Sequence, residues 1–307
     1  MSRDPDSLHL VLVGSTASGK SGLAMELARC LPGPPVEIVS ADAMQVYRSI
    51  NVGTAKPSAA DQAEVPHHLI DVVEPHEDFS VARFQAEARK VVADIEARGA
   101  RALVVGGTGL YVRALVDDLE LPGQWPEVRD DIENEADTAV LHDRLHHLDP
   151  VAAGRMTPVN RRRVVRALEV TLGSGRPFSS FGPGLTEHFE TRYRMAGVWL
   201  PRPVVGQRIK ERFDAMLGAG LVDEVRTLAA RPQGLSRTAG QALGYREVFD
   251  HLAGRCSLEQ AVEEAVRRTR AFARRQRMWF RRDPRITWYG AAEDPVTLLP
   301  ALLGDWS

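Results

Sequence analysis

The stretch LVLVGSTASGKSGLAMELA, residues 10–28, decides the fold class of this chain. Its apolar start predicts a buried strand, its end predicts a helix, and a glycine-rich loop lies between them. The loop fits G-x-x-x-x-G-K-[ST] at every fixed position. Backbone N–H groups of such a loop point at an anion, and the positive end of the following helix adds to the attraction. We predict a phosphate-binding loop made of Gly14, Ser15, Thr16, Ala17, Ser18, Gly19, Lys20 and Ser21.

Two side chains of this loop carry specific chemistry. Lys20 supplies a mobile positive charge, and the Ser21 hydroxyl can bind Mg²⁺. ATP is the usual ligand, but a nucleoside triphosphatase needs an apolar strand that ends in a Mg²⁺-ordering Asp. The best apolar strand, at 100–107, ends in Gly106–Gly107 instead. The loop alone therefore leaves open whether it binds ATP or another diphosphate.

Strand and helix patterns alternate around the loop. Strands are predicted at 36–42, 100–107 and 193–200, a short apolar run lies at 66–75, an amphipathic helix at 81–99, and further helices up to residue 282. This alternation predicts a parallel α/β sheet flanked by helices, a P-loop NTPase-like core. Between residues 121 and 190 helical patterns and Gly/Pro-rich breaks replace it. We therefore predict a core of residues 1–120 and 191–307, interrupted by an all-helical insertion domain at 121–190.

Composition narrows the cellular setting. The chain of 307 residues has a formal net charge of −2, which by itself does not indicate a nucleic-acid partner. Its two cysteines, Cys30 and Cys256, lie far apart and lack metal-ligand spacing, which favours a reducing cytoplasm over a disulfide framework. Without a long uncharged apolar stretch, no membrane span is expected.

Two further polar residues follow predicted strands. In open α/β sheets, ligands bind outside the carboxyl ends of the strands, so Asp42 and Thr108 are expected to face the same crevice as the loop. A carboxylate there can order Mg²⁺ or accept a proton. The alternative for Asp42 is a cap on the next helix, and for Thr108 a capped strand-to-helix turn.

Arginines gather in two places. Residues 267–282 read RRTRAFARRQRMWFRR, with eight Arg and no acid. On a helix, Arg267, Arg270, Arg274, Arg277 and Arg281 fall within an arc of about 80°. The opposite side, with Phe272 and Trp279, is expected to be buried. NRRRVVR, residues 160–166, forms a second cluster. These clusters suit an RNA backbone, although an arginine run can also be a solvated or acid-paired face.

Several motifs together resemble one family. GSTASGKS, SADAMQVYRSINVGTAKP (40–57), VVGGTGLYVRAL (104–115), RRVVRALEV (162–170), GQALGYREV (240–248) and RRQRMWF (274–280) occur in the order found in tRNA dimethylallyltransferases. The chain resembles the shorter bacterial form of that family over residues 10–282. It departs from the common pattern at Ala43, where the family often has Ser, and at Met278, where Thr is common.

The resemblance implies an activity and roles for residues. A dimethylallyl group would move from dimethylallyl diphosphate to N6 of adenosine 37, next to the anticodon of tRNAs that read codons beginning with U. Asp42 would be the general base, Lys20 and Arg212 would stabilise the leaving diphosphate, and Thr108 would contact tRNA. The family also implies Mg²⁺ at Ser21 and a monomeric, cytoplasmic enzyme.

The same resemblance implies a set of tRNA contacts. These are Asp42, Ala43, Met44, Gln45, Thr108, Arg129, Arg162, Arg163, Arg166, Gln241, Gly244, Tyr245, Arg246, Arg274, Arg275, Gln276, Arg277, Trp279 and Arg281.

Two rival functions remain to be separated by assay. A P-loop kinase for a small metabolite explains residues 10–42 but not the arginines. An RNA-binding NTPase-like regulator explains the arginines but leaves Asp42 without a role.

Overall fold

The computed structural model describes residues 9–182 and 184–306. Their contacts divide the chain into two compact units, Met1–Asp117 with Glu190–Ser307, and Asp118–Phe189. The first border therefore falls at Asp117 where residue 120 was predicted, and the second at Glu190 where residue 191 was predicted.

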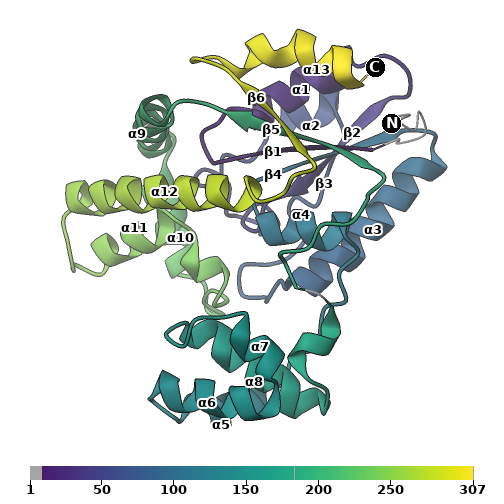
Figure 1. The fold of residues 1–307 in the computed structure, drawn as a ribbon. Helices are drawn as coiled ribbons and strands as arrows, with labels where there is room; N and C mark the ends of the chain where they lie inside the picture. The colour runs from purple at the N-terminus through teal and green to yellow at the C-terminus, as the bar shows by residue number, and fades with distance from the viewer. Residues whose placement is uncertain (1–8, 183, 307) are drawn as a thin grey trace. The chain divides into compact units, whose positions relative to one another are not determined.

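The larger unit is built on a parallel sheet with strand order β3-β2-β4-β1-β5-β6 (Figure 1). Its strands are β1 His9–Gly14, β2 Val36–Ala41, β3 His67–His68, β4 Arg101–Gly106, β5 Tyr193–Trp199 and β6 Ile286–Gly290. Every neighbouring pair is parallel. Because parallel strands need crossover connections, helices cover both faces of such a sheet. The predicted α/β fold class is confirmed.

The helices of this unit follow the predicted alternation. They are α1 Lys20–Cys30, α2 Ala59–Glu64, α3 Val81–Ala97, α4 Gly109–Val116, α9 Arg202–Gly218, α10 Leu221–Ala229, α11 Tyr245–Leu252, α12 Leu258–Phe280 and α13 Leu299–Trp306, with short 3₁₀ turns η2 Ala239–Gln241 and η3 Pro295–Leu298. In Figure 1, α1 and α13 lie on one side of the sheet and α3, α4 and α12 on the other.

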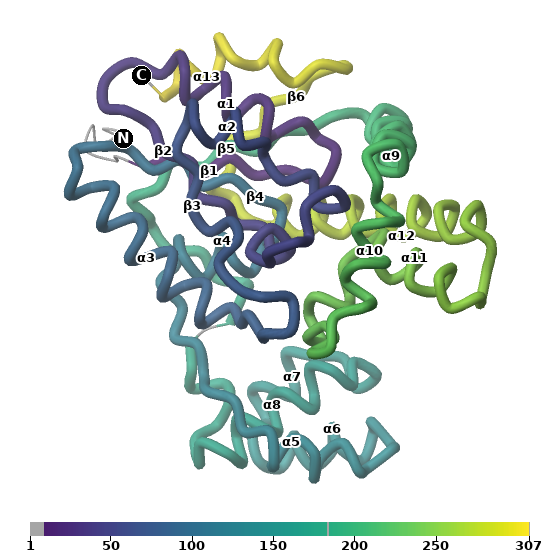
Figure 2. Tube along the Cα trace, turned by 180° about the vertical axis from the view of Figure 1, so that it is seen from behind, coloured from purple at the N-terminus to yellow at the C-terminus, as the bar shows by residue number. Residues whose placement is uncertain are grey.

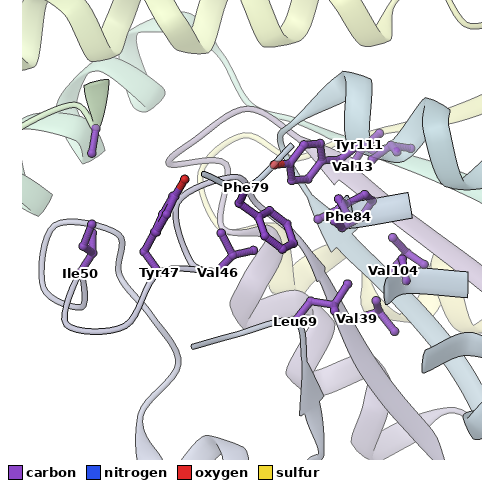
Figure 3. Close-up of a cluster of buried hydrophobic side chains, with 14 of the residues drawn as sticks. Val13, Val39, Val46, Tyr47, Ile50, Leu69, Phe79, Phe84, Val104 and Tyr111 are labelled. Atoms are coloured by element: carbon purple, nitrogen blue, oxygen red, sulfur yellow. The ribbon is translucent and has the colours of Figure 1, made fainter. Parts of the chain in front are cut away.

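Successive residues of β1 enter different cores. Leu10 and Leu12 belong to the cluster that packs against α1 and α13. Val11 and Val13 belong to the cluster on the opposite face, part of which Figure 3 shows. In that second cluster the ring of Phe84 stacks on Tyr111 with centroids 4.1 Å apart. The two-residue period of a strand therefore feeds both faces of the sheet, which is why β1 is apolar throughout.

The structure extends the sheet beyond the predicted elements. The strand β6 pairs with β5, and α13 follows it, although no strand or helix was predicted after residue 282. The five residues of β6 are mostly half-buried or exposed, so they lack the continuous apolar run that marked β1. The predicted run at 66–75 yields only the short β3 and a bridge between Tyr47 and Val73.

The smaller unit contains helices and no strand within its described residues. Its elements are α5 Pro126–Glu133, α6 Thr138–Leu148, α7 Pro150–Gly154, α8 Arg161–Ser174 and the 3₁₀ turn η1 Phe178–Phe181, which Figure 2 lets the reader follow between α4 and β5. They share a small core that includes Ile132, Leu141, Leu145, Val164 and Leu168.

Candidate active site and RNA-binding surfaces

The phosphate-binding loop joins β1 to α1 as predicted. Ala17 and Gly19 both have positive φ, 60° and 76°, which curls the backbone. A Cβ on Gly19 would lie 2.4 Å from Pro295 Cγ, and one on Gly14 would lie 2.6 Å from Ser18 Oγ. Glycine is therefore required at both positions by space, and at Gly19 also by its backbone conformation.

Lys20 begins α1 and lies inside the loop. Its Nζ donates to the carbonyl oxygen of Ser15 at 3.4 Å. Burial lowers the pKa of Lys20 to about 8, an effect that the charge of Asp42 opposes and the charge of Arg212 reinforces. The three charged groups therefore lie near enough to act on one another.

Arg212 approaches the loop from α9. Its Nη1 donates to Thr16 Oγ1 at 3.3 Å, and its Nη2 donates to the carbonyl oxygen of Gly53 at 3.5 Å. Burial lowers the pKa of Arg212, and the Asp42 charge partly restores it. The predicted arginine thus lies at the first residues of the phosphate-binding loop.

Asp42 follows β2 and opens a turn. Its Oδ1 accepts the N–H of Met44 at 2.8 Å. No helix follows, because residues 43–46 form a turn, so the alternative of a helix cap is wrong. The second oxygen, Oδ2, has no hydrogen-bond donor among residues 9–182 and 184–306.

Thr108 holds the Asp42 turn from β4. It precedes α4, but its side chain makes no capping hydrogen bond there. Instead Thr108 Oγ1 accepts the N–H of Ala43 at 3.1 Å. The predicted pair of residues after β2 and β4 is therefore connected directly, and the plain-cap alternative for Thr108 is wrong.

Residues 50–56 are held by hydrogen bonds to side chains of α10 and α11. Tyr245 is 1% exposed, and its hydroxyl accepts the N–H of Gly53 at 3.0 Å and donates to Glu224 at 2.5 Å. Glu224 also accepts the N–H groups of Asn51 and Val52, at 3.1 and 3.0 Å. Burial raises the pKa of Tyr245, so the hydroxyl stays protonated. Tyr245, predicted as a tRNA contact, is a buried support of this segment.

The Gly53 segment also uses Gln45. Its Oε1 accepts from Ser40 Oγ at 2.9 Å, and its Nε2 donates to the carbonyl oxygen of Thr54 at 3.3 Å. Met44, Ala43 and Gln45 are half-buried beside Asp42. The predicted contacts that follow β2 are thus grouped at the carboxyl end of the sheet.

Gln276 joins α12 to the phosphate-binding loop. Its Oε1 accepts the N–H of Thr16 at 2.8 Å, and its Nε2 donates to the carbonyl oxygen of Gly107 at 2.9 Å. A Cβ on Gly107 would lie 2.4 Å from Gln276 Nε2, and one on Gly109 would lie 2.2 Å from the Trp279 ring. Both glycines therefore admit α12 side chains to close approach.

The predicted arginine stripe of α12 is divided by its partners. Arg267 pairs with Glu264, and Arg270 donates to the carbonyl oxygen of Gly206. Arg277 turns inward and lies 5.1 Å from the centroid of the Trp199 ring. The stripe is exposed as predicted except at Arg277, which is half-buried. Arg267 is exposed but already paired with an acid.

Two arginines of the stripe differ from Arg267 and Arg270 because they lack a partner among the described residues. Arg274 and Arg281 are exposed without a side-chain partner in the part of the chain that the structure describes. Arg275 covers the ring of Phe272 at 5.8 Å from its centroid. Phe272 and Trp279 are half-buried where they were expected in the core. The cover that Arg275 gives to its ring explains why Phe272 is half-buried.

A hollow near α11 collects further predicted residues. It is lined by Ser236, Arg237, Gly240, Gln241, Arg246, Phe249, Asp250 and Arg255. Arg255 pairs with Asp250, whereas Arg237 and Arg246 are exposed without a partner among the described residues. Gly244, which was also predicted as a tRNA contact, is buried. It is the N-cap residue just before α11 and has φ 90°.

The smaller unit separates its predicted arginines into two kinds. Arg129 and Arg166 both pair with Glu169, whose side chain is 2% exposed. Arg162 and Arg163 are exposed in the first turn of α8 and contact no acid in the described ranges. Only the second kind offers free guanidinium groups to an RNA backbone.

Sequence reasoning missed two residues near the loop. Arg208 lies one turn before Arg212 on α9, with Nη1 3.0 Å from the Cβ position of Gly19. Glu224 holds Asn51 and Val52 as described above. The four-residue spacing from Arg212 was a signal for Arg208, since such residues share a helix face.

Ser21 is the residue available for a metal at the loop. It is exposed at the start of α1, and its hydroxyl has no partner within the described ranges. Those ranges hold no group of three or more His, Cys, Asp or Glu side chains arranged for a metal ion. They also hold no helix long and apolar enough to cross a membrane.

The family follows from comparison with known proteins. A family model described as IPP transferase matches residues 45–283. The chain belongs to the IPP transferase family. A tRNA dimethylallyltransferase of Nocardioides sp. strain JS614 is 47% identical over 312 residues, which cover 99% of each chain.

Two solved IPP transferase structures share the fold. The crystal structure of the full-length tRNA isopentenylpyrophosphate transferase from Bacillus halodurans has a TM-score of 0.70 and 36% identity, with 98% of this chain and 95% of that chain covered. A eukaryotic dimethylallyltransferase described as acting on tRNA has a TM-score of 0.79 and 26% identity, with 96% and 77% covered. The predicted family resemblance is confirmed.

Proposed function

We propose that this chain is a tRNA dimethylallyltransferase that transfers the dimethylallyl group of dimethylallyl diphosphate to N6 of adenosine 37 and releases diphosphate. One observation carries the proposal for this site. The charges of Asp42, Lys20 and Arg212 act on one another, and Arg212 bonds to Thr16 of the loop, so that a carboxylate able to accept a proton lies near two cations and a phosphate-binding loop. An alkylation that expels diphosphate needs both parts.

The cations stabilise the leaving group. As the bond between the allylic carbon and oxygen breaks, negative charge builds on the bridging oxygen of the diphosphate. Lys20, Arg212 and the N–H groups of the loop would stabilise that charge. Removing one such pre-organised donor typically costs ~3–4 kcal/mol of barrier.

Asp42 receives the proton that the adenine amine loses. The N6 lone pair is delocalised into the purine, so the amine is a poor nucleophile until its proton is removed. The Oδ1 atom is occupied by the N–H of Met44, which leaves Oδ2 for this proton. Thr108 keeps the turn in place through Ala43. Base catalysis of this kind contributes roughly 10²–10⁴ in rate.

Mg²⁺ needs only one or two protein ligands at a site of this kind. It usually keeps several waters and is held by one or two protein oxygens together with substrate phosphates. The exposed Ser21 hydroxyl, which has no partner in the part of the chain described, supplies one such oxygen. The ion would neutralise charge on the diphosphate.

The tRNA substrate is recognised by surfaces of both units. Among the described residues, the exposed arginines without a partner on α8 and α12 include Arg162, Arg163, Arg274 and Arg281. The target base must leave its stack to reach the crevice, at a cost of a few kcal/mol. A single-stranded loop is the RNA element in which bases are most easily turned out. We expect the enzyme to act as a monomer in the cytoplasm.

A nucleoside assay separates this function from its rivals. The protein and Mg²⁺ are incubated with unmodified tRNA and either dimethylallyl diphosphate or ATP, and the digested tRNA is analysed. We expect N6-prenylated adenosine with the prenyl donor alone. Turnover of ATP without prenylated adenosine would instead identify a kinase or an NTPase-like regulator and overturn the proposal.

A further inference from the structure

The helix α9 places two arginines over the phosphate-binding loop. Arg212 Nη1 bonds to Thr16 Oγ1 at 3.3 Å. Arg208 Nη1 lies 3.0 Å from the position that a Cβ on Gly19 would take. Four residues along a helix correspond to a rise of about 6 Å on nearly the same face. The two guanidinium groups therefore lie over the first and the last part of one loop.

Arg208 has no counter-charge of its own. It is half-buried, and no acceptor for its guanidinium lies among the described residues. Arginines elsewhere on the helical side, such as Arg267 and Arg268, are paired with Glu264 and Glu247. A guanidinium group without an acid partner is available to a ligand that supplies the opposite charge. The loop below Arg208 is built to hold such a ligand.

Two side chains from outside the loop lie beside Gly19, those of Pro295 and Arg208. Pro295 of η3 fills the space beside Gly19, with Cγ 2.4 Å and Cδ 3.3 Å from the Cβ position. Apolar ring atoms cannot bind an anion. Arg208 lies at the same place and has donors in a planar fork, which match phosphate oxygens in pairs.

We propose that Arg208 binds the terminal phosphate of the diphosphate, while Arg212 binds the phosphate that carries the prenyl group. The assignment rests on the proposed function. Arg212 also donates to the carbonyl oxygen of Gly53, in the segment that follows Asp42, so the reacting carbon and its phosphate belong at the Arg212 end of the loop. The terminal phosphate then extends towards Gly19 and Arg208.

This division predicts different kinetic roles. The terminal phosphate keeps its bonds during the reaction, so Arg208 binds substrate and transition state about equally. An interaction of that kind affects KM and leaves kcat nearly unchanged. Arg212 lies beside the oxygen that becomes charged, so it affects kcat.

Titration with inorganic ligands tests the binding role without any prenyl transfer. Arg208→Gln, Arg208→Lys and Arg212→Gln are compared with Lys210→Gln, which removes an exposed charge from the same helix. The full-length proteins are titrated by calorimetry with inorganic diphosphate and with inorganic phosphate, in the presence of Mg²⁺. Unchanged circular dichroism and melting temperature show that each variant is folded.

We expect Arg208→Gln to weaken diphosphate binding roughly 10-fold or more. Phosphate binding should change much less, because one phosphate can bind at the Arg212 end alone. The diphosphate affinity of Arg208→Lys should lie between those of Arg208→Gln and the parent protein. The affinity of Lys210→Gln should match that of the parent protein. Equal losses for both ligands, or an unchanged diphosphate affinity in Arg208→Gln, would overturn the assignment.

Steady-state kinetics with tRNA complete the test. In Arg208→Gln we expect KM for the prenyl donor to rise roughly 10-fold while kcat stays nearly constant. A kcat loss as large as that of Arg212→Gln would contradict the separate roles. If the parent protein transfers no prenyl group, the proposed function fails, yet the diphosphate titration still decides the role of Arg208.

Discussion

Asp42 and Lys20 differ in how firmly hydrogen bonds within the protein hold their charged groups. Asp42 uses Oδ1 to hold the N–H of Met44, which orients the carboxylate and leaves Oδ2 for a proton. Within residues 9–182 and 184–306, Lys20 Nζ donates only to the carbonyl oxygen of Ser15, at 3.4 Å. The carboxylate is thus held in place by its own turn, whereas the ammonium group can turn towards a phosphate.

Replacing Asp42 by Asn tests the base. The amide is almost the same size and can still accept the Met44 N–H, but it cannot take the N6 proton. We expect single-turnover prenyl transfer to slow roughly 10²–10⁴-fold. Binding of tRNA, measured by filter retention, should stay unchanged. Weaker tRNA binding together with a normal rate of transfer would refute the assigned role.

The pH dependence of diphosphate binding tests Lys20. Burial lowers its pKa to about 8 in the free protein, so the ammonium form that binds diphosphate is present below pH 8 and is lost as the pH rises through 8. A bound diphosphate raises this pKa, because an opposite charge favours the protonated form. We therefore expect affinity to fall above about pH 8 and binding there to take up a proton.

Calorimetry in buffers of different ionisation enthalpy measures that proton. The matched variant is Lys20→Arg, because arginine keeps its charge over the same pH range. Its binding should take up fewer protons near pH 8, since only the titration of the ligand itself remains. Equal proton uptake by both proteins would show that Lys20 does not titrate as inferred.

At the scale of elements, α12 performs different tasks on different sides. Gln276 reaches inward to Thr16 and Gly107, and Trp279 packs on Gly109. Arg274 faces solvent from the same helix. The helix that we propose contacts RNA through Arg274 therefore also supports the phosphate-binding loop.

The contact between α11 and the 50–56 segment is tested by Tyr245→Phe. The change removes only the hydroxyl that accepts from Gly53 and donates to Glu224. Leaving these buried groups without a partner costs about 1–3 kcal/mol. We expect hydrogen exchange to speed up at the amides of Gly53 and its neighbours, while amides of α3 keep their protection. Unchanged exchange at Gly53 would show that the hydroxyl does not hold the segment.

At the scale of the whole molecule, balanced charge conceals local charge. The chain has 39 Lys and Arg against 41 Asp and Glu. Acids neutralise some arginines directly, as Glu169 does in the smaller unit and Glu264 in the larger one. Other arginines are left exposed in each unit, so net charge says little about RNA binding.

The salt dependence of tRNA binding tests which arginines contact phosphate. We expect Arg274→Gln to weaken binding and to reduce the slope of log K against log salt by about 0.7–0.9. Arg267→Gln is the matched control, because Arg267 on the same helix is already paired with Glu264. Equal effects of both substitutions would show that pairing in the free protein does not decide the contact with RNA.

Local patterns predicted the elements that carry the site. The glycine positions and the continuous apolar run of β1 report backbone conformation and burial, which depend on neighbours in sequence. Asp42 and Thr108 could be placed because the carboxyl ends of parallel strands meet at one edge. The strand β6 was missed, since a short and half-exposed edge strand has little apolar pattern.

The α/β class, the phosphate-binding loop and the family could all be recognised from residue patterns along the chain. Which polar side chains remain free depends on the packing of distant segments. Gln276 meets Thr16 across 260 residues, Arg208 meets Gly19 through α9, and Arg277 turns inward against Trp199. A periodic pattern shows which face of a helix is apolar, but the partner of a polar group comes from a distant segment. That partner is set by packing, so it cannot be read along the chain.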